Sequence, residues 1–377
     1  MRTQQLTLVA AVACALPGAA FADVTMYGFM SGGIESARAT GGASEYKTAT
    51  RMVDNNSRIG FKGGEDLGDG LKAVWQLESS LRGFEQGGVN DKNQSATFGT
   101  RNSFVGLSGE RWGTVELGNV DTAYKLLTDI GLSVQPNMVT DQNTGGSVVY
   151  NRRVTRLTNS VHYMSPTLNG FKFGASYGVD EARPTATDGT RQNNDRLSLA
   201  GNYSNGGLQL ALGYDREGDK LNGSASSDGQ KSVTAGKLAV SYTFATGTLV
   251  GAGLEHVKTA LNGSADTTQN DWLIALSQPL TCPLTLKAGY AVLGKLDGAS
   301  VGNPDDYKAR QWFVGATYDL SKRTQLYAYG TRVSNHAQQN ADFPTNPVYS
   351  SGIGSASAAL AKGSNLQAIG AGLMVAF

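Results

Sequence analysis

Cysteine and histidine are scarce in this chain. Its 377 residues include two cysteines, Cys14 and Cys282, and three histidines, His162, His256 and His336. Cys14 lies in a leader that we expect to be cleaved, so Cys282 alone remains and no disulfide can form within the mature chain. No cysteines or histidines have the spacing of a metal site, and we therefore expect neither a metal ion nor another cofactor.

The motifs of common enzyme classes are also missing. The chain has no Gly-x-Ser-x-Gly elbow and no glycine-rich phosphate loop. His162 stands two residues from Ser160, but a nucleophilic hydrolase also needs an acid or an amide that orients the histidine. The sequence therefore predicts a protein that is not an enzyme.

An excess of charge of either sign is missing as well. The chain has 32 lysines and arginines and 31 aspartates and glutamates. Removal of the leader takes Arg2 with it and makes the two numbers equal. Because proteins that bind nucleic acid carry a basic excess, we expect no nucleic-acid partner. Any electrostatic function must come from the arrangement of the charges.

Long apolar runs are absent after residue 22, where no stretch approaches the roughly 18 residues that a membrane helix requires. One shorter apolar segment, Leu6–Leu16, follows a positively charged start and precedes the small-residue site Ala20–Ala22. This order is typical of a secretory signal peptide, so we expect residues 1–22 to be cleaved and residues 23–377 to form a single domain. A lipoprotein signal at Cys14 is the alternative, but the usual leucine three residues earlier is absent.

Glycine (49 residues) and tyrosine (15 residues) are abundant, and apolar and polar residues alternate along much of the chain. A period of two is the pattern of a β-strand with two unlike faces. The last segment, 365–377, places Ile369, Leu373 and Phe377 on one face and smaller residues on the other. A final strand that ends on an aromatic is typical of an outer-membrane barrel, and a buried last strand of a soluble sandwich is the alternative.

Short turns alternate with longer polar connections along the chain. The short turns lie at 65–70, 108–113, 165–170, 204–207, 243–247, 279–283 and 319–323. The longer connections lie at 39–50, 83–95, 121–150, 179–193, 216–231, 259–269, 295–307 and 334–364. Short periplasmic turns alternating with long external loops are the organisation of an outer-membrane barrel. These connections join 16 strands, and we expect an all-β, transmembrane, antiparallel β-barrel.

The second face of the expected strands indicates a water-filled interior. In residues 71–78, Leu71 and Trp75 face one way, whereas Lys72 and Glu78 face the other. Charges and glycines recur on this second face in strand after strand, which a dry core could not tolerate. A barrel with this many strands encloses an aqueous channel. The segments 249–256 and 324–330 alternate poorly, and we assign no faces to them.

Several short motifs occur in an order that spans the mature chain. They lie at 24–28, 57–63, 65–73, 101–107, 113–118 and 320–324, followed by the terminal Phe377. In this order they resemble a general porin of the Gram-negative outer membrane, of the beta-proteobacterial type. The resemblance implies a homotrimer of sixteen-stranded barrels, surrounded by outer-membrane lipid and lipopolysaccharide, that passes ions and small hydrophilic solutes. It also implies that the third long loop folds into the lumen and narrows it.

Three arginines are expected on the lumen wall of that constriction. Each lies opposite apolar residues that would face lipid: Arg58 opposite Ile59 and Phe61, Arg101 opposite Phe98 and Phe104, and Arg156 opposite Val161 and Tyr163. The three positions also fall where similar porins carry an arginine cluster. Arg82 and Arg152 are further candidates for lumen charges.

The third loop, about 121–146, would supply the facing side of the constriction. Asp121 and Asp129 are its candidate carboxylates, whereas Lys125 departs from the acid-rich loop tip of similar porins. Opposed charges across a water-filled neck create a transverse field that sets ion preference.

With three wall arginines and a lysine on the loop, we expect a mild preference for anions. Two alternatives stay open. One is a substrate-selective porin, for which Tyr124 and Tyr150 are too few aromatics to decide. The other is a plugged structural or adhesive barrel, although the expected loops are polar and rich in glycine.

Overall fold

The computed structural model describes residues 23–43, 45–81, 98–134, 149–179, 194–218, 230–261, 264–281, 283–298, 301–348 and 360–377. Several sequence predictions lie outside these residues: the signal peptide at 1–22, the candidate lumen charge Arg82 and the single mature cysteine Cys282. The connection predicted at 83–95, most of those at 179–193 and 216–231, and residues 135–146 of the predicted third loop lie outside them as well.

The described chain is almost entirely β-strand. The strands are β1 (Asp23–Thr40), β2 (Tyr46–Asp54), β3 (Arg58–Gly68), β4 (Leu71–Ser80), β5 (Ser103–Gly109), β6 (Gly113–Asp121), β7 (Arg156–Met164), β8 (Phe171–Gly178), β9 (Arg196–Asn205), β10 (Leu208–Glu217), β11 (Gln230–Thr243), β12 (Leu249–Leu261), β13 (Thr267–Thr281), β14 (Leu284–Asp297), β15 (Ala309–Asp319), β16 (Thr324–Asn335) and β17 (Asn365–Ala376). Two short helices interrupt them, α1 (Ala123–Thr128) and the 3-10 helix η1 (Pro304–Tyr307). Neither helix is long and apolar enough to cross a membrane in the part of the chain that is described.

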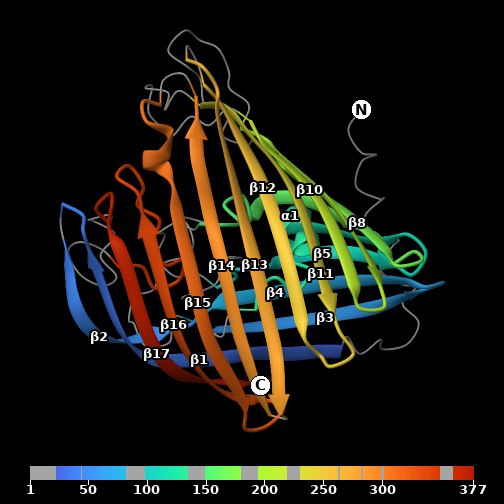
Figure 1. Cartoon of the computed structure of the whole chain (residues 1–377). Coiled ribbons are helices and arrows are strands. Elements are labelled where there is room, and N and C mark those ends of the chain that lie inside the picture. The colour runs from blue at the N-terminus through green and yellow to red at the C-terminus, as the bar shows by residue number, and fades with distance from the viewer. Residues whose placement is uncertain are drawn as a thin grey trace, which may run out of the picture.

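The strands wrap into a closed barrel with α1 inside the ring (Figure 1). Apart from β2 and β3, which both pair with β1, consecutive strands pair antiparallel with each other. β1 also pairs with β17 from Phe29↔Ala376 to Thr40↔Asn365. The seam continues to the terminal residue, because the backbones of Gly28 and Phe377 exchange hydrogen bonds of 3.2 and 3.0 Å.

The predicted sixteen-stranded barrel is confirmed once β2 and β3 are recognised as one bent strand. Both pair with β1, β2 over Gly32–Ala39 and β3 over Asp23–Phe29. The bend between them lies at Asn56, whose φ of 66° is in the left-handed region that asparagine tolerates better than most residues.

All seven predicted short turns join consecutive strands. Two of the predicted longer connections are shorter than expected. The connection predicted at 39–50 is only 41–45, and the one predicted at 259–269 is only 262–266. The small and polar residues there were interpreted as loop, but they continue the alternation of the strands: Thr48 and Met52 face outward, and Arg51 faces inward.

The faces of the strands match the prediction in most segments. Phe171, Phe173 and Tyr177 of β8 are exposed on the outer face, as are Ile369 and Leu373 of β17. The two segments without assigned faces alternate in the structure. Glu255 of β12 and Tyr327 and Tyr329 of β16 point inward and are buried. Glycine and alanine on both faces had hidden this alternation in the sequence.

The predicted outward position of Phe104 is wrong. In β5 this residue pairs with Gln76 of β4, and the two line an inner cavity together with Lys62 and Glu116. Its neighbours Val105 and Leu107 face outward instead. The strand begins only at Ser103, after a turn, so the parity counted from Phe98 does not carry through.

Two segments between strands fold back into the barrel. The first holds α1 and residues up to 134, and the second is 336–348. The largest buried cluster joins them to the wall, since Leu132 and Val134 of the first segment and Phe343 and Val348 of the second belong to it. The barrel is therefore packed partly by its own loops.

Candidate constriction site

Helix α1 is fixed to the inner wall by polar contacts at its first residues. Thr122 is the N-cap, and its Oγ1 accepts a 3.3 Å hydrogen bond from the Lys125 amide. The amide of Ala123 donates to Ser176 Oγ of β8 at 2.8 Å, and the amide of Tyr124 donates to Ser198 Oγ of β9 at 3.0 Å. Wall serines thus satisfy amides that the first turn of a helix leaves without partners.

The side chain of Tyr124 reaches across to β12. Its hydroxyl donates to Glu255 Oε2 at 2.7 Å, and Lys237 Nζ lies 4.5 Å from the centre of its ring and 3.3 Å from Glu255 Oε2. Burial and the nearby carboxylate of Glu255 raise the pKa of Tyr124 well above its usual value. The phenol therefore stays a hydrogen-bond donor, and the helix is held against β8–β12.

Glycines on the wall make room for this segment. A Cβ atom at Gly213 of β10 would lie 2.7 Å from Cδ2 of Tyr124 and 2.8 Å from Cγ2 of Thr128. At Gly253 of β12 a Cβ atom would meet the hydroxyl of Tyr150. The close approach of the helix to the wall depends on glycine at these positions.

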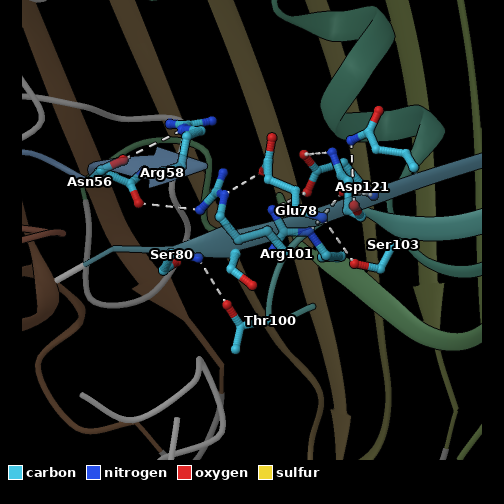
Figure 2. Close-up of polar contacts among 12 residues, drawn as sticks. Asn56, Arg58, Glu78, Ser80, Thr100, Arg101, Ser103 and Asp121 are labelled. Atoms are coloured by element: carbon cyan, nitrogen blue, oxygen red, sulfur yellow. Dashed lines mark hydrogen bonds and ion pairs between the residues drawn. The ribbon is translucent and has the colours of Figure 1, made fainter. Parts of the chain in front are cut away.

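The predicted wall arginines Arg58 and Arg101 lie in one cluster with Asp121 (Figure 2). Arg156, the third predicted arginine, joins this cluster through its ion pair with Asp121. Arg101 is mostly buried, and its Nε donates to Glu78 Oε1 at 2.5 Å while its Nη1 donates to Asn56 Oδ1 at 3.2 Å. Glu78 also accepts a 3.0 Å hydrogen bond from the Tyr27 hydroxyl. The charge of Arg101 is therefore compensated by the strand beside it.

Arg58 belongs to the same cluster but has different contacts from Arg101. Its guanidinium carbon lies 4.7 Å from the centre of the Phe29 ring, and its Nε is 3.4 Å from the Asn56 carbonyl oxygen. No carboxylate forms an ion pair with Arg58 in the portion of the chain that is described. Of the three predicted arginines, Arg58 has the least compensated positive charge.

Arg156 joins the wall to the loop. Its Nη2 lies 3.2 Å from Asp121 Oδ1, and its Nε donates to Asn102 Oδ1 at 2.8 Å. Asp121 also pairs with Lys125 Nζ at 3.1 Å. The predicted loop carboxylate Asp121 therefore lies among cations on the arginine side of the lumen.

The other predicted loop carboxylate and the extra lumen charge have local partners. Asp129 accepts hydrogen bonds from the amide and the hydroxyl of Ser133 at 3.1 and 2.7 Å, which closes the end of α1. Arg152 Nε lies 2.8 Å from Asp271 Oδ2, and its Nη1 donates to Gln269 Oε1 at 2.9 Å. Arg152 thus fastens the returning end of the loop to β13.

Glu78, Asn56 and Asn102 were not predicted from the sequence as part of the site. Glu78 follows Gln76 on the polar face of its strand, so its inward direction was visible. Its pairing with Arg101 depends on the register between strands separated by a long connection, which no local pattern gives. In the described ranges no three His, Cys, Asp or Glu side chains gather as ligands for a metal ion.

The second inward segment, 336–348, is hydrogen-bonded to the barrel wall through Arg51 of β2. This side chain forms a buried ion pair with Glu35 of β1 and donates to the carbonyl oxygens of Pro347 and Asn346 at 3.0 and 2.6 Å. Asp342 accepts hydrogen bonds from the amides of Phe343 and Val348 at 2.7 and 3.0 Å. Burial raises the pKa of Asp342 to about 7.

The cluster around the arginines can act on ions that enter the lumen. It holds Arg58, Arg101, Arg156 and Lys125 against Glu78 and Asp121, so positive charge is in excess. A charged neck with low-dielectric walls concentrates ions of the opposite sign. The arrangement is chemically suited to attracting anions.

Residues 8–338 match the Gram-negative porin family. The chain is 31% identical over 378 residues to an outer membrane porin protein of Bordetella pertussis, covering 88% of this chain and 94% of that protein. It is also 31% identical to the major outer membrane protein P.IB of Neisseria meningitidis serogroup B, covering 84% and 90%.

Solved structures share the fold. An anion-selective porin from Comamonas acidovorans superposes with a TM-score of 0.70 at 22% identity, over 94% of this chain and 100% of that one. The trimer form of OmpT, an outer membrane protein of Vibrio cholerae, superposes with a TM-score of 0.64 at 15% identity, over 94% and 99%.

Proposed function

This chain belongs to the Gram-negative porin family and forms a diffusion channel in the outer membrane, and we propose that Arg58, Arg101 and Arg156 give the channel a mild preference for anions. The observation that carries the proposal is the position of Arg58, which faces the lumen without a carboxylate partner among the described residues. The name of the related Comamonas acidovorans structure, an anion-selective porin, agrees with this preference.

The ion pairs of the cluster explain why the preference is mild. Glu78 compensates Arg101, and Asp121 is shared by Arg156 and Lys125. A passing anion therefore meets a weaker field, because these two carboxylates cancel part of the positive charge and water screens what remains.

The channel is proposed to work as a homotrimer whose leader, residues 1–22, is removed on export. Trimeric assembly is supported by the likeness to the trimer form of OmpT of Vibrio cholerae. The family consists of channels, and we propose that the protein has no enzymatic activity. His162 supports this, since its two ring nitrogens are hydrogen-bonded to Ser160 and Ser176 at 2.7 and 2.8 Å in a buried position.

The test is the conductance of the purified protein in a planar bilayer under a potassium chloride gradient. Current steps in groups of three with a reversal potential on the chloride side are the expected result. A reversal potential on the potassium side would contradict the anion preference and leave the channel intact. A folded protein without conductance would contradict the open pore itself.

A further inference from the structure

A groove crosses the outer surface of the barrel over β14–β17 and β1. Its volume is about 880 Å³, and its lining is mostly apolar, including Leu286, Val314, Ala316, Ala328 and Ile369. The floor is low at Gly330 of β16, whose partners on the neighbouring strands are the larger Val314 and Ile369. Ala328 extends this low floor between two further alanines, Ala316 and Ala371. This surface lies outside the pore, and the constriction does not use it.

Two basic side chains are among the residues that line the groove. Arg38 of β1 and Arg332 of β16 both line it, and both stand opposite Gln367 of β17, so the three form one row across adjacent strands. Arg38 donates from Nε and Nη2 to Gln367 Oε1 at 2.9 and 2.6 Å. Arg310 of β15 lies two residues further along, opposite Ser334.

These arginines are exposed on the outward face and are uncompensated there. No aspartate or glutamate forms an ion pair with Arg38, Arg310 or Arg332 as far as the chain is described. Gln367, which accepts the hydrogen bonds of Arg38, adds no negative charge. Exposed guanidinium groups beside an apolar surface are suited to charge-assisted, bidentate hydrogen bonds with an anion such as a phosphate.

The row lies at the depth of the external membrane interface. Trp312 stands opposite Arg332, Tyr290 stands opposite Trp312, and the rings of Trp272 and Tyr290 are 5.6 Å apart. Trp and Tyr side chains gather where the hydrocarbon meets the headgroups. The row is near the strand ends that lead into the long connection 336–364, and long connections are external in such barrels.

We propose that this groove binds a lipid with a phosphorylated headgroup from the external leaflet. The phosphate is held between Arg38 and Arg332, and acyl chains lie in the groove over Ala328 and Gly330. The guanidinium group is suited to this contact, because its planar donors match phosphate oxygens in pairs. The hydrogen bonds to Gln367 orient Arg38 before the lipid arrives, which lowers the entropic cost of binding.

The experiment uses the full-length mature protein refolded in detergent and incubated with the bisphosphorylated glycolipid lipid A or with its dephosphorylated form. Lipid retained on the folded protein is measured by native mass spectrometry. The test variant is R38Q/R332Q, and the matched control is K322Q/R323Q, which removes two exposed basic residues from the turn at the opposite end of the barrel.

The wild type and the control are expected to retain the phosphorylated lipid in preference to the dephosphorylated one. The R38Q/R332Q variant is expected to bind it about tenfold to thirtyfold more weakly, as the loss of two interfacial arginines implies. A second variant, Gly330→Phe, keeps both arginines and fills the floor of the groove, where a Cβ atom meets only Ile369 Cγ1 at 3.5 Å. It should weaken binding as well.

Equal retention by the wild type and R38Q/R332Q would overturn the proposal, as would equal binding of the two lipids. The proposal would also be wrong if R38Q/R332Q lost the trimer while it retained as much lipid as the wild type. Such a result would mean that a second copy of the chain, and not a lipid, covers the groove in the trimer. Single-channel conductance is expected to be unchanged in all these variants. A failure here therefore leaves the proposed anion preference of the pore untouched.

Discussion

Arg101 donates from its Nε to Oε1 of Glu78 at 2.5 Å, and this pair divides the arginines of the constriction into two kinds. Arg101 and Arg156 each have a carboxylate beside them, whereas Arg58 has none among the described residues. The net field at the neck therefore depends more on Arg58 than a count of arginines suggests. This difference can be tested one residue at a time.

The first prediction concerns Arg58 and Arg101. Arg58→Gln is expected to lower the chloride-to-potassium permeability ratio by a factor of about five, since a unit charge acting through water at about 4 Å contributes about 1 kcal/mol. Arg101→Gln should change the ratio less, because Glu78 already offsets that charge. Reversal potentials in a potassium chloride gradient measure both ratios. A larger effect of Arg101→Gln would contradict the role given to Glu78.

The second prediction concerns Asp121, which is shared by Arg156 and Lys125. Asp121→Asn keeps the size of the side chain and removes its charge, so both cations become uncompensated. The anion preference is expected to rise, again by a factor of about five for one unit charge. Asp129→Asn is the matched control, because that carboxylate is hydrogen-bonded to Ser133 at the end of α1. Its effect on the reversal potential should be smaller.

The third prediction concerns the room that Gly213 leaves for α1. Gly213→Val would bring side-chain atoms against Tyr124 and Thr128, and the helix can move only toward the lumen. Single-channel conductance is expected to fall. Gly236→Val on the neighbouring strand is the control, since nothing lies within 4 Å of a Cβ atom there. A similar fall in both variants would show that the effect comes from the strands and not from the helix.

The fourth prediction is a pH dependence of the segment 336–348. The pKa of Asp342 is about 7 with the segment docked, and its ordinary value is 3.8. Docking is therefore most favourable below about pH 4, where the carboxyl is neutral in both states. It weakens as the pH rises through 7, by up to about 4 kcal/mol on the usual conversion of a pKa difference.

Amide hydrogen exchange in 336–348, corrected for its intrinsic pH dependence, measures this effect. Protection is expected to decrease between pH 4.5 and pH 8 in the wild type. Asp342→Asn should remain equally protected at both values, because it has no charge to bury. Arg51 is the cation that faces Asp342, and Arg51 is itself paired with Glu35. A wild type that is equally protected at both pH values would rule out the mechanism.

The sequence predicted the barrel because its signals are local. Six of the seven short turns contain glycine, asparagine or proline, as in Ser204–Gly207, and only the turn at 319–323 has none of them. Most strands show their two faces by alternation. The inward direction of Arg58 followed from its neighbours Ile59 and Phe61 in the same way. Parity failed at Phe104, where a turn with Gly99 at a φ of 85° separates the segment from the strand.

Local sequence patterns could not predict which side chains pair with each other within the site. Glu78 and Arg101 are 23 positions apart, and Arg51 and Pro347 are 296 apart. Which residues meet at these separations depends on strand register and on the folding of long connections into the lumen. A polar loop gives no sign of whether it will bury a side chain such as Phe343, because its one or two apolar residues form no periodic pattern.

The seam between β1 and β17 also determines when the barrel can close. Phe29 pairs with Ala376, and these strands stand at opposite ends of the domain. All other neighbours in the ring are consecutive in the chain and can pair as soon as they meet, whereas this pairing waits for the last strand. Pairings between distant segments are slow to form, and open strand edges attract other chains. The newly exported polypeptide therefore exposes the unpaired edges of β1 and β17 until these two strands pair. Aggregation is the greatest risk to assembly during this interval.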